Sequence, residues 1–267
     1  MAINFESLKV QYNPEGSQLR KAQLRMLDMM KFVDKICQKN NIPYWLDSGT
    51  LLGAIRHNGF IPWDDDVDMG MMRKDIPKFI KAVKKETNNT QFIIQTRAND
   101  PGFMQEWPVL RDLKSEYIQD TQLHNLRKYR GLQIDLFPFD SGIFRFLLVW
   151  GQFLNIMKCN EIEKKHFLRA KIIDQTCAHF LFPIWRLLKI SQHHKNLLCC
   201  TYGCGYEIFI NQNNIFPLKK HNFEGYEFNI PCNYDIYLKK IYGNNYMDLP
   251  SEDKRFAHTT EIKMDSL

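Results

Sequence analysis

The chain has 267 residues, of which 44% are hydrophobic, 13% aromatic and 25% charged. These fractions are typical of a globular protein and exclude an intrinsically disordered chain. No apolar run approaches the roughly 20 residues of a membrane-spanning helix, and residues 1–9 lack the pattern of a secretory signal. We therefore expect a soluble, cytoplasmic protein whose seven cysteines are reduced thiols.

The net charge is +6, from 36 basic against 30 acidic residues. A mild positive charge suits anionic partners such as nucleotides, phosphorylated glycans or an acidic membrane face. An ordinary solvated basic surface explains it equally well. No nucleic-acid partner is expected, because no basic stripe interleaved with aromatic residues is present.

Residues 17–140 are predicted to alternate helices with strands. Apolar residues at three- and four-residue steps predict a helix from Ser17 to Cys37. Shorter helices are expected over 50–57 and from an Asp75 cap to Lys85. Short strands are expected at 44–46, 67–69, 92–94, 109–110, 117–118 and 132–137, the last stopped by Pro138. The fold class is therefore α/β or α+β.

The second half has a different pattern. Residues 144–198 are dominated by helical periodicity, with apolar clusters over 144–157 and 180–188. We predict that the first cluster is a core helix covering the sheet, with contact to a membrane surface as the alternative. Residues 223–230 resemble a hairpin around Gly225, and a short helix follows. We expect a core over 1–140 and a mostly helical part over 141–267 packed on it as one compact unit.

Four carboxylates lie close together in the segment 64–68. Asp66 and Asp68 are two positions apart, so on a strand both side chains leave the same face. Asp64 shares that face if the strand begins early, whereas Asp65 points the other way. Paired carboxylates form a hard-oxygen site suited to Mg²⁺ or Mn²⁺. An exposed acidic loop is the alternative.

The segment Ser48-Gly49-Thr50 stands between a predicted strand and a predicted helix. Glycine allows a ligand to approach the backbone closely, and a helix start offers free N–H groups to a phosphate. The hydroxyls of Ser48 and Thr50 add donors. Ser48 acting only as a helix cap is the alternative, but an anion site next to acidic residues fits a metal that bridges the two.

Asp135 is an acidic residue inside an otherwise apolar strand. Ile134 and Leu136 flank it, so Asp135 lies on the opposite face from both. A carboxylate there requires a partner or a metal, which makes it a candidate third ligand; a hydrogen-bonded strand end is the alternative. Asp140 is expected in a turn.

Three blocks of this sequence resemble the LicD family, which includes bacterial phosphorylcholine transferases and is related to the fukutin-type phosphotransferases. The first block is YWLDSGTLLGAIRHNGFIPWDDDVDM at 44–69, and QIDLFP at 133–138 is similar to the second. FEGYEFNIP at 223–231, NYDIYL at 233–238 and YGNNYMDLP at 242–250 resemble the C-terminal block. The similarity runs from about residue 20 to 258, and residues 141–222 carry little of it.

The resemblance implies an α+β, nucleotidyltransferase-like mixed sheet flanked by helices. By residue-to-residue transfer, Gly49 and Thr50 would hold phosphate, and Asp66, Asp68 and Asp135 would bind Mg²⁺ or Mn²⁺. The implied donor is CDP-choline or another CDP-alcohol, and the implied acceptor is a hydroxyl of a cell-surface glycan or its lipid-linked precursor. Asp135 or Asp64 would accept the proton of that hydroxyl.

Other residues are weaker candidates. Arg56 and Arg111 are candidates to neutralise phosphate charge, with surface arginines as the alternative. Trp63 is a candidate to stack on a base or to contact choline. Trp45 is expected in the core and His57 in a helix-end hydrogen bond. Arg255 and His258 are interpreted as solvated tail residues, with an approach to the site as the alternative.

Three further hypotheses concern the cysteines, the activity and the class of protein. Cys199, Cys200 and Cys204 have irregular spacing, so incidental thiols are favoured over a zinc site. Transfer of another phospho-polyol or of a nucleotidyl group is the competing activity. A catalytically idle subunit of a glycan-assembly complex is the competing class, and the intact set Asp66, Asp68 and Asp135 argues against it.

Overall fold

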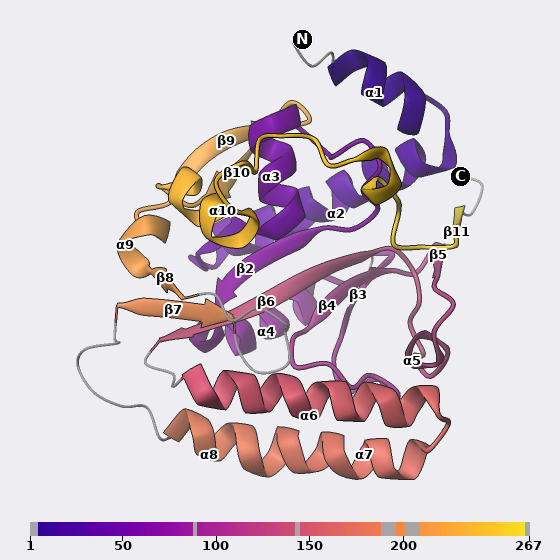
Figure 1. Ribbon diagram of the computed structural model, residues 1–267, viewed down its shortest axis with the longest axis vertical. Helices are drawn as coiled ribbons and strands as arrows, with labels where there is room; N and C mark the ends of the chain where they lie inside the picture. Colours follow the sequence, from indigo (N-terminus) through magenta and orange to yellow (C-terminus); the bar gives the residue numbers. More distant parts are fainter. Residues whose placement is uncertain (1–4, 88–89, 142–144, 188–195, 201–208, 265–267) are drawn as a thin grey trace.

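The computed structural model describes residues 5–87, 90–141, 145–187, 196–200 and 209–264, and its centre is a seven-stranded mixed sheet (Figure 1). Five strands follow the order β1-β2-β6-β4-β3, β7 also pairs with β6, and β8 pairs with β7. The β2–β6 pair is parallel and every other pair in this sheet is antiparallel. The predicted mixed sheet flanked by helices is thereby confirmed. The strands are β1 (Tyr44–Leu46), β2 (Asp68–Met72), β3 (Phe92–Gln95), β4 (Val109–Asp112), β6 (Gln133–Ser141), β7 (Leu197–Cys200) and β8 (Ile210–Asn211).

The register of β2 and β6 places acidic residues side by side. Asp68 is opposite Asp135, and Gly70 is opposite Phe137. The alternate residues Met69 and Leu136 are fully buried on the other face, as the alternation of these strands predicts. Consequently one face of the sheet carries the carboxylates and the opposite face is apolar.

Helices cover the apolar face. The long helix α2 (Gln18–Lys39) and α4 (Ile76–Glu86) lie behind the sheet in Figure 1. The side chain of Ser17 accepts a hydrogen bond from the backbone N–H of Arg20, so the predicted N-cap of α2 is confirmed. An additional helix, α1 (Phe5–Tyr12), was not predicted.

The carboxylate-bearing face is covered by other elements. Helix α3 (Ser48–His57) and α10 (Tyr234–Tyr242) lie in front of β2 in Figure 1. The hairpin of β9 (Lys219–Phe223) and β10 (Tyr226–Ile230) turns at Glu224 and Gly225, which have φ of 51° and 83°. Two residues with positive φ suit a tight hairpin, so the predicted turn around Gly225 is confirmed.

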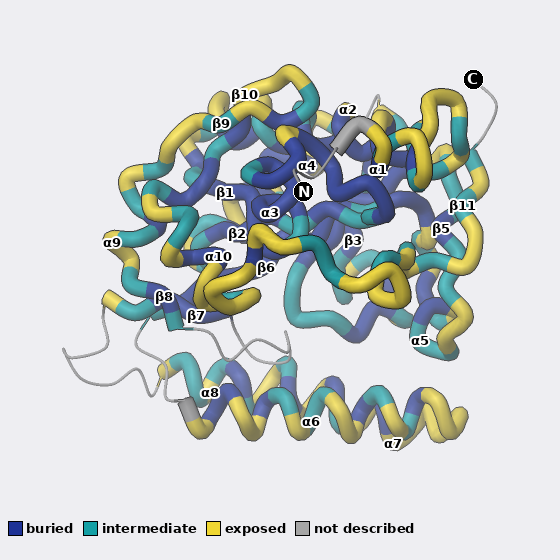
Figure 2. Tube along the Cα trace, turned by 45° about the horizontal axis from the view of Figure 1, so that its top comes forward, coloured by how far each residue is buried: buried dark blue, intermediate teal, exposed yellow. Residues whose placement is uncertain are grey.

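Residues 145–187 form a helical hairpin at one side of the sheet (Figures 1 and 2). Helix α6 (Arg145–Glu163) lies beside α7 (Phe167–Thr176), which continues through a π-helical turn (Cys177–Leu181) into α8 (Phe182–Leu187). The predicted helical character of this region is correct up to residue 187. None of the described helices is both long enough and apolar enough to cross a membrane.

The second half of the chain also contributes strands, which its helical pattern did not predict. Residues 197–200 form β7 and extend the sheet along β6, although residues 197 and 198 were expected in a helix. Near the C-terminus, β11 (Glu261–Met264) pairs with β5 (Ser115–Ile118). The main hydrophobic core accordingly contains residues from Ala22 to Tyr246.

The predicted end of β6 at Pro138 is wrong, because the strand continues to Ser141. On the edge away from β2, β6 pairs with β4 through residues 133–135 and with β7 through residues 139–141. Pro138 lies between these two ladders, where its missing N–H leaves no strand partner unbonded. Asp140, expected in a turn, is buried in this strand and forms an ion pair with Arg73.

The pleat of β7 points Cys199 and Cys200 to opposite faces of the sheet. Cys200 belongs to the main core, whereas Cys199 packs with Leu147 and Leu148 in a second cluster. Adjacent strand residues point to opposite faces, so Cys199 and Cys200 do not converge on one ion. Cys204, together with the histidines at 193 and 194, lies outside the described residues.

Candidate functional site

The turn between β1 and α3 is fixed by Asp47 rather than by Ser48. Asp47 is the N-cap of α3; its Oδ1 accepts hydrogen bonds from the Ser48 N–H at 2.8 Å and from the Tyr237 hydroxyl at 2.6 Å. Burial raises the pKa of Asp47 to about 6. Ser48 is already the first helical residue, with a φ of 45°. The alternative that Ser48 acts only as a helix cap is therefore wrong, because the cap is supplied one residue earlier.

Thr50 and Gly49 contact the acidic residues from the first turn of α3. The Oγ1 atom of Thr50 accepts the backbone N–H of Asp68 at 2.9 Å, which fixes the start of β2 against α3. A Cβ atom at Gly49 would lie 3.1 Å from Oδ2 of Asp64. Glycine at this position thus leaves room for the Asp64 carboxylate.

The structure brings Asp64, Asp66, Asp68 and Asp135 together at the start of β2. Desolvation is the largest cause that raises the pKa of each, and the neighbouring carboxylates add to it for Asp64 and Asp68. The pKa of Asp66 rises to about 6, lowered somewhat by His258 and raised further by Asp135. Their mutual repulsion means that this cluster favours a cation.

The carboxylate of Asp135 is oriented by two neutral donors. Trp107 Nε1 donates to its Oδ1 at 2.6 Å, and Gln133 Nε2 donates to its Oδ2 at 3.0 Å. Tyr117 places a buried hydroxyl near the same acids, and this oxygen has no hydrogen-bond partner among the described residues. The third predicted ligand is therefore held in one orientation with lone pairs remaining on both oxygens.

Asp65 precedes β2, which begins at Asp68, and it binds the C-terminal segment while one carboxylate oxygen stays within 4.8 Å of ligand atoms of Asp64 and His258. Its Oδ1 accepts the backbone N–H of His258 at 2.9 Å, and its Oδ2 accepts the N–H of Thr259 at 2.9 Å. This brings Nε2 of His258 to 3.9 Å from Oδ2 of Asp66. The guanidinium of Arg255 lies 5.5 Å from the ring centroid of Trp63. The interpretation as solvated tail residues is therefore wrong for Arg255, whose side chain is mostly buried, whereas His258 remains exposed while it lines the cavity.

A cavity of about 480 Å³ opens beside the acidic cluster. Its walls come from α3, from the segment before β2 and from the C-terminal segment, and they combine aromatic, cationic and acidic side chains. The lining residues are Gly49, Leu52, Arg56, Ile61, Trp63, Asp64, Tyr242, Asn245, Tyr246, Asp248, Leu249, Pro250, Lys254, Phe256 and His258. This size suits a small organic ligand.

Arg56 lies in the cavity wall but is also a structural bridge. Its Nη1 donates to the backbone carbonyls of Tyr246 at 3.2 Å and Asp248 at 3.0 Å, and its Nε donates to Nε2 of His57 at 2.9 Å. Burial lowers the pKa of Arg56 to about 10 and that of His57 to about 3. Arg56 therefore remains charged at neutral pH, whereas His57 is neutral and shares a hydrogen bond at the helix end, as expected.

Arg111 is neither a surface residue nor part of the cavity wall. It is fully buried in β4, where Nε donates to Gln95 Oε1 at 2.7 Å and Nη1 donates to the Gly131 carbonyl at 2.9 Å. Burial is the largest cause that lowers its pKa, to about 9. Its positive charge acts on Asp135 through the sheet, where it opposes the rise of the Asp135 pKa. The surface interpretation is wrong, and the geometry does not support direct phosphate contact.

The acidic cluster fits a divalent hard cation. Its side chains offer only oxygen, Asp68 and Asp135 are opposite each other in register, and Asp66 precedes Asp68 by two positions. Oxygen donors of this kind are preferred by Mg²⁺ and Mn²⁺. The pKa shifts point the same way, because the carboxylates repel one another when no cation is present.

Several residues of this site were not predicted. Trp107 and Gln133 orient Asp135, while Tyr237 supports Asp47 from helix α10. Trp45 packs in the core as predicted, and its Nε1 donates to Tyr237 at 3.2 Å. Of these, only the role of Gln133 could be predicted, because it lies two positions before Asp135 on the same strand. Trp107 and Tyr237 approach from distant segments of the chain.

Comparison with known proteins identifies the family. The model described as "LicD/FKTN/FKRP, nucleotidyltransferase domain" matches residues 41–187. Lipopolysaccharide cholinephosphotransferase LicD of Haemophilus influenzae is 27% identical over 262 residues, covering 90% of this chain and 95% of that protein. An uncharacterized protein of Rickettsia typhi is 33% identical over 189 residues, or 64% and 60% of the two chains. Ribitol 5-phosphate transferase FKRP of Mus musculus is 30% identical over 130 residues, or 48% and 23%. The chain belongs to the LicD family.

Proposed function

We propose that this protein is a metal-dependent transferase that moves a phosphoryl-alcohol group from a CDP-alcohol to a hydroxyl of a glycan or its lipid-linked precursor. The observation that carries the proposal is the convergence of Asp66, Asp68 and Asp135 beside the cavity in a chain of this family. The transferred phosphorus gains a bond to the acceptor oxygen and loses its bond to CMP. We place the reaction on the cytoplasmic side of the membrane.

The acids would hold the metal. Asp66, Asp68 and Asp135 are the ligands, with Trp107 and Gln133 fixing the orientation of Asp135. When bound, Mg²⁺ or Mn²⁺ would neutralise charge on the phosphoryl oxygens and stabilise the CMP leaving group. Thr50 positions Asp68 by accepting the backbone N–H of Asp68. This supporting role comes in addition to the phosphate contact expected from the sequence.

The donor would occupy the cavity with its phosphates near the start of α3. Gly49 allows close approach, and the positive end of the α3 dipole at this turn attracts negative charge. Arg56 and Lys254 add positive charge to the wall, and Trp63 adds an aromatic surface. Ser48 supports this turn from a buried position.

Asp64 is the better proton acceptor of the two candidates. It lines the cavity, whereas both oxygens of Asp135 already accept hydrogen bonds. In our account Asp64 therefore accepts the proton of the attacking hydroxyl, and Asp135 serves as a ligand.

The relatives support two donor classes. One is named a cholinephosphotransferase and another a ribitol 5-phosphate transferase. We propose CDP-choline as the first donor, because the relative of that kind aligns with 90% of this chain, and a CDP-polyol as the second.

CMP release tests this function directly. The purified protein is incubated with CDP-choline or CDP-ribitol, Mg²⁺ and an oligosaccharide acceptor, and CMP is measured by chromatography. We expect release with one donor and a loss of roughly 10³-fold in Asp68→Asn and in Asp135→Asn. Asp28→Asn, an exposed substitution on α2, is the matched control and should retain full activity.

Two results would contradict this proposal. Activity that persists in both variants would overturn the metal assignment. Absence of CMP with every CDP-alcohol tested, while another nucleotide releases its product, would replace the donor class with nucleotidyl transfer.

A further inference from the structure

The helical hairpin of residues 145–187 exposes an apolar stripe on α6. Large apolar residues recur there at three- and four-residue spacing, and each is at least 40% exposed: Val149, Trp150, Phe153, Ile156 and Met157. This spacing places them along one side of the helix. A stripe of this kind on a helix is unusual for a surface in contact only with water.

The second arm carries a matching stripe. Leu168, Ile172, Phe180, Ile184 and Leu187 follow one another at three-, four- or eight-residue steps along α7, the π-turn and α8, and they are 51–84% exposed. Figure 2 shows exposed positions repeating along the whole length of both arms. The apolar surface is thus a property of the hairpin, not of one residue.

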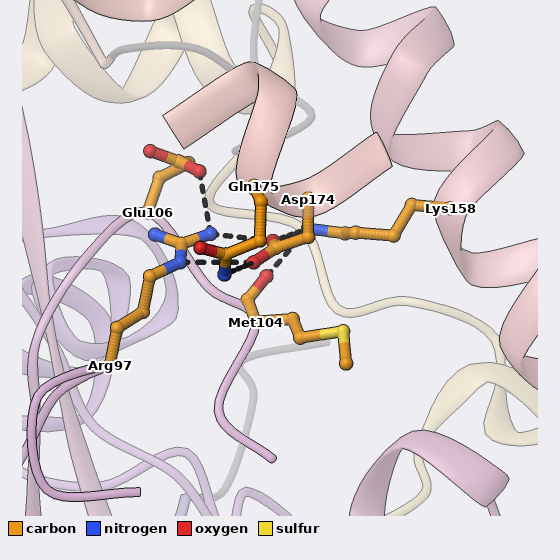
Figure 3. A network of polar contacts seen from close by, with 6 residues as sticks. All are labelled: Arg97, Met104, Glu106, Lys158, Asp174 and Gln175. Atoms are coloured by element: carbon orange, nitrogen blue, oxygen red, sulfur yellow. Dashed lines mark hydrogen bonds and ion pairs between the residues drawn. The ribbon is translucent and has the colours of Figure 1, made fainter. Parts of the chain in front are cut away.

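The opposite side of the hairpin is fixed to the protein. Asp174 of α7 is 2% exposed and accepts from Arg97 Nη2 at 2.7 Å and from Lys158 Nζ of α6 at 3.2 Å (Figure 3). Arg97 also donates to Glu106 at 2.7 Å, so the network joins both arms to the segment before β4. Because this side is fixed by buried contacts, the apolar stripes are held facing outward.

Positive charge is concentrated where the two arms meet. Lys164, Lys165 and Lys171 are all exposed, and Glu163 is the exposed acid beside them. Apolar stripes next to lysines are the pattern of helices that lie in the interface of an anionic bilayer. A second copy aligned parallel would bring the same lysines together, and one aligned antiparallel would leave them without an anionic partner, so the charge favours a lipid surface.

We propose that this hairpin docks the protein on an anionic phospholipid surface, with its two arms lying in the plane of the membrane. The aromatic and aliphatic side chains enter the headgroup boundary, and the three lysines contact lipid phosphates. The proposal stands on the hairpin alone and does not depend on the activity assigned to the acidic cluster.

Vesicle co-sedimentation tests the proposal with the full chain. Vesicles of phosphatidylcholine alone are compared with vesicles of equal parts phosphatidylcholine and phosphatidylglycerol. We expect binding to the anionic vesicles, a loss of roughly tenfold or more in Trp150→Ser/Phe153→Ser, and a loss of roughly 30-fold in Lys164→Gln/Lys165→Gln.

Leu113→Ser is the matched control, because Leu113 is 51% exposed in the turn between β4 and β5. It should bind like the unchanged protein, and circular dichroism should give all four proteins the same thermal transition. Failure to bind anionic vesicles, or equal binding to both vesicle types, would overturn the proposal. So would a dimer in analytical ultracentrifugation that Trp150→Ser/Phe153→Ser dissociates.

Discussion

At the scale of single residues, the position of Asp68 is determined from two sides. Its backbone N–H donates to Thr50, and its carbonyl accepts the N–H of Asp47 at 3.0 Å. The same strand places it opposite Asp135. The helix, the turn and the neighbouring strand therefore all fix the backbone of the residue that carries this carboxylate.

Gly49→Ala separates activity from stability. The added Cβ would approach Oδ2 of Asp64 to 3.1 Å, so the carboxylate must move by a few tenths of an ångström. We expect kcat/KM to fall by roughly tenfold, because misplacement of a reacting group is costly. Alanine favours a helix, so the free energy of unfolding should stay equal or rise by up to about 1 kcal/mol. Unchanged kcat/KM with equal stability would remove Asp64 from the reaction.

The acids also predict a pH dependence of stability in the metal-free protein. The pKa of Asp66 is raised from 3.8 to about 6, so the folded protein binds this proton more tightly than the unfolded chain. Its contribution, up to about 3 kcal/mol, is present below about pH 4 and is lost as the pH rises through about 6. Urea unfolding with a chelator present should therefore find less stability at about pH 8 than at about pH 5.

Asp66→Asn is the control for this dependence of stability on pH. The amide cannot ionise, so the variant should lose less stability between the two pH values than the unchanged protein does. Asp47, whose pKa is also raised to about 6, should leave a residual slope. An identical slope in Asp66→Asn and in the unchanged protein would contradict the shift assigned to Asp66.

The sequence predicted the acids but not their partners. The two-residue spacing of Asp66 and Asp68 and the apolar neighbours of Asp135 were visible locally. The strands β2 and β6 place Asp68 opposite Asp135, and Asp66 lies in the segment just before β2. Trp107 and Tyr117 were invisible because their roles depend on contacts with segments far along the chain. Arg111 was misplaced for the same reason: it was proposed to contact phosphate, with a surface position as the alternative, whereas β4 buries it.

At the scale of elements, the hairpin is attached by charge as well as by packing. Asp174 is almost completely buried and contacts both Arg97 and Lys158, which lowers its pKa below its usual value despite burial. Glu106 belongs to the same network and directly precedes Trp107, the donor to Asp135. The hairpin thus supports the segment that orients one acid of the site.

Asp174→Asn tests that attachment. The substitution keeps the shape but leaves Lys158 buried next to a neutral group, so the free energy of unfolding should fall by about 3 kcal/mol. Asp28→Asn, which removes an exposed ion pair with Lys31, should change it by less than about 1 kcal/mol. Urea denaturation measures both. A loss no larger than that of Asp28→Asn would mean that packing alone holds the hairpin.

Elements with a strong period and the short strands of the first half were predictable, whereas the short strands of the second half were not. The amphipathic pattern of α2 gave bounds within a few residues of Gln18–Lys39, and the turn at Gly225 was recognised from its glycine. The strands β7, β8 and β11 have two to four residues each and pair with distant segments. Pro138 shows the limit of a local rule, because the pairing of β6 on either side decided whether a proline could be accommodated.

At the scale of the whole molecule, the C-terminal segment completes a site that begins near residue 47. Asp65 holds residues 258 and 259, and Arg56 holds the carbonyls of 246 and 248. The cavity therefore has walls from residues 49–64 and from residues 242–258. Neither the cavity nor the approach of His258 to Asp66 could be read from spacing, because both arise when distant segments meet.

Divalent-ion binding shows directly whether the acidic cluster holds a metal. Isothermal titration of the full chain with Mn²⁺ is carried out on the unchanged protein, on Asp68→Asn and on Asp28→Asn. Asp28 is an exposed acid on α2 that takes no part in the cluster. We expect the unchanged protein and Asp28→Asn to bind Mn²⁺ with similar affinity and Asp68→Asn to lose at least about tenfold. Equal affinity in all three proteins, or no binding by any of them, would mean that the cluster is not a metal site.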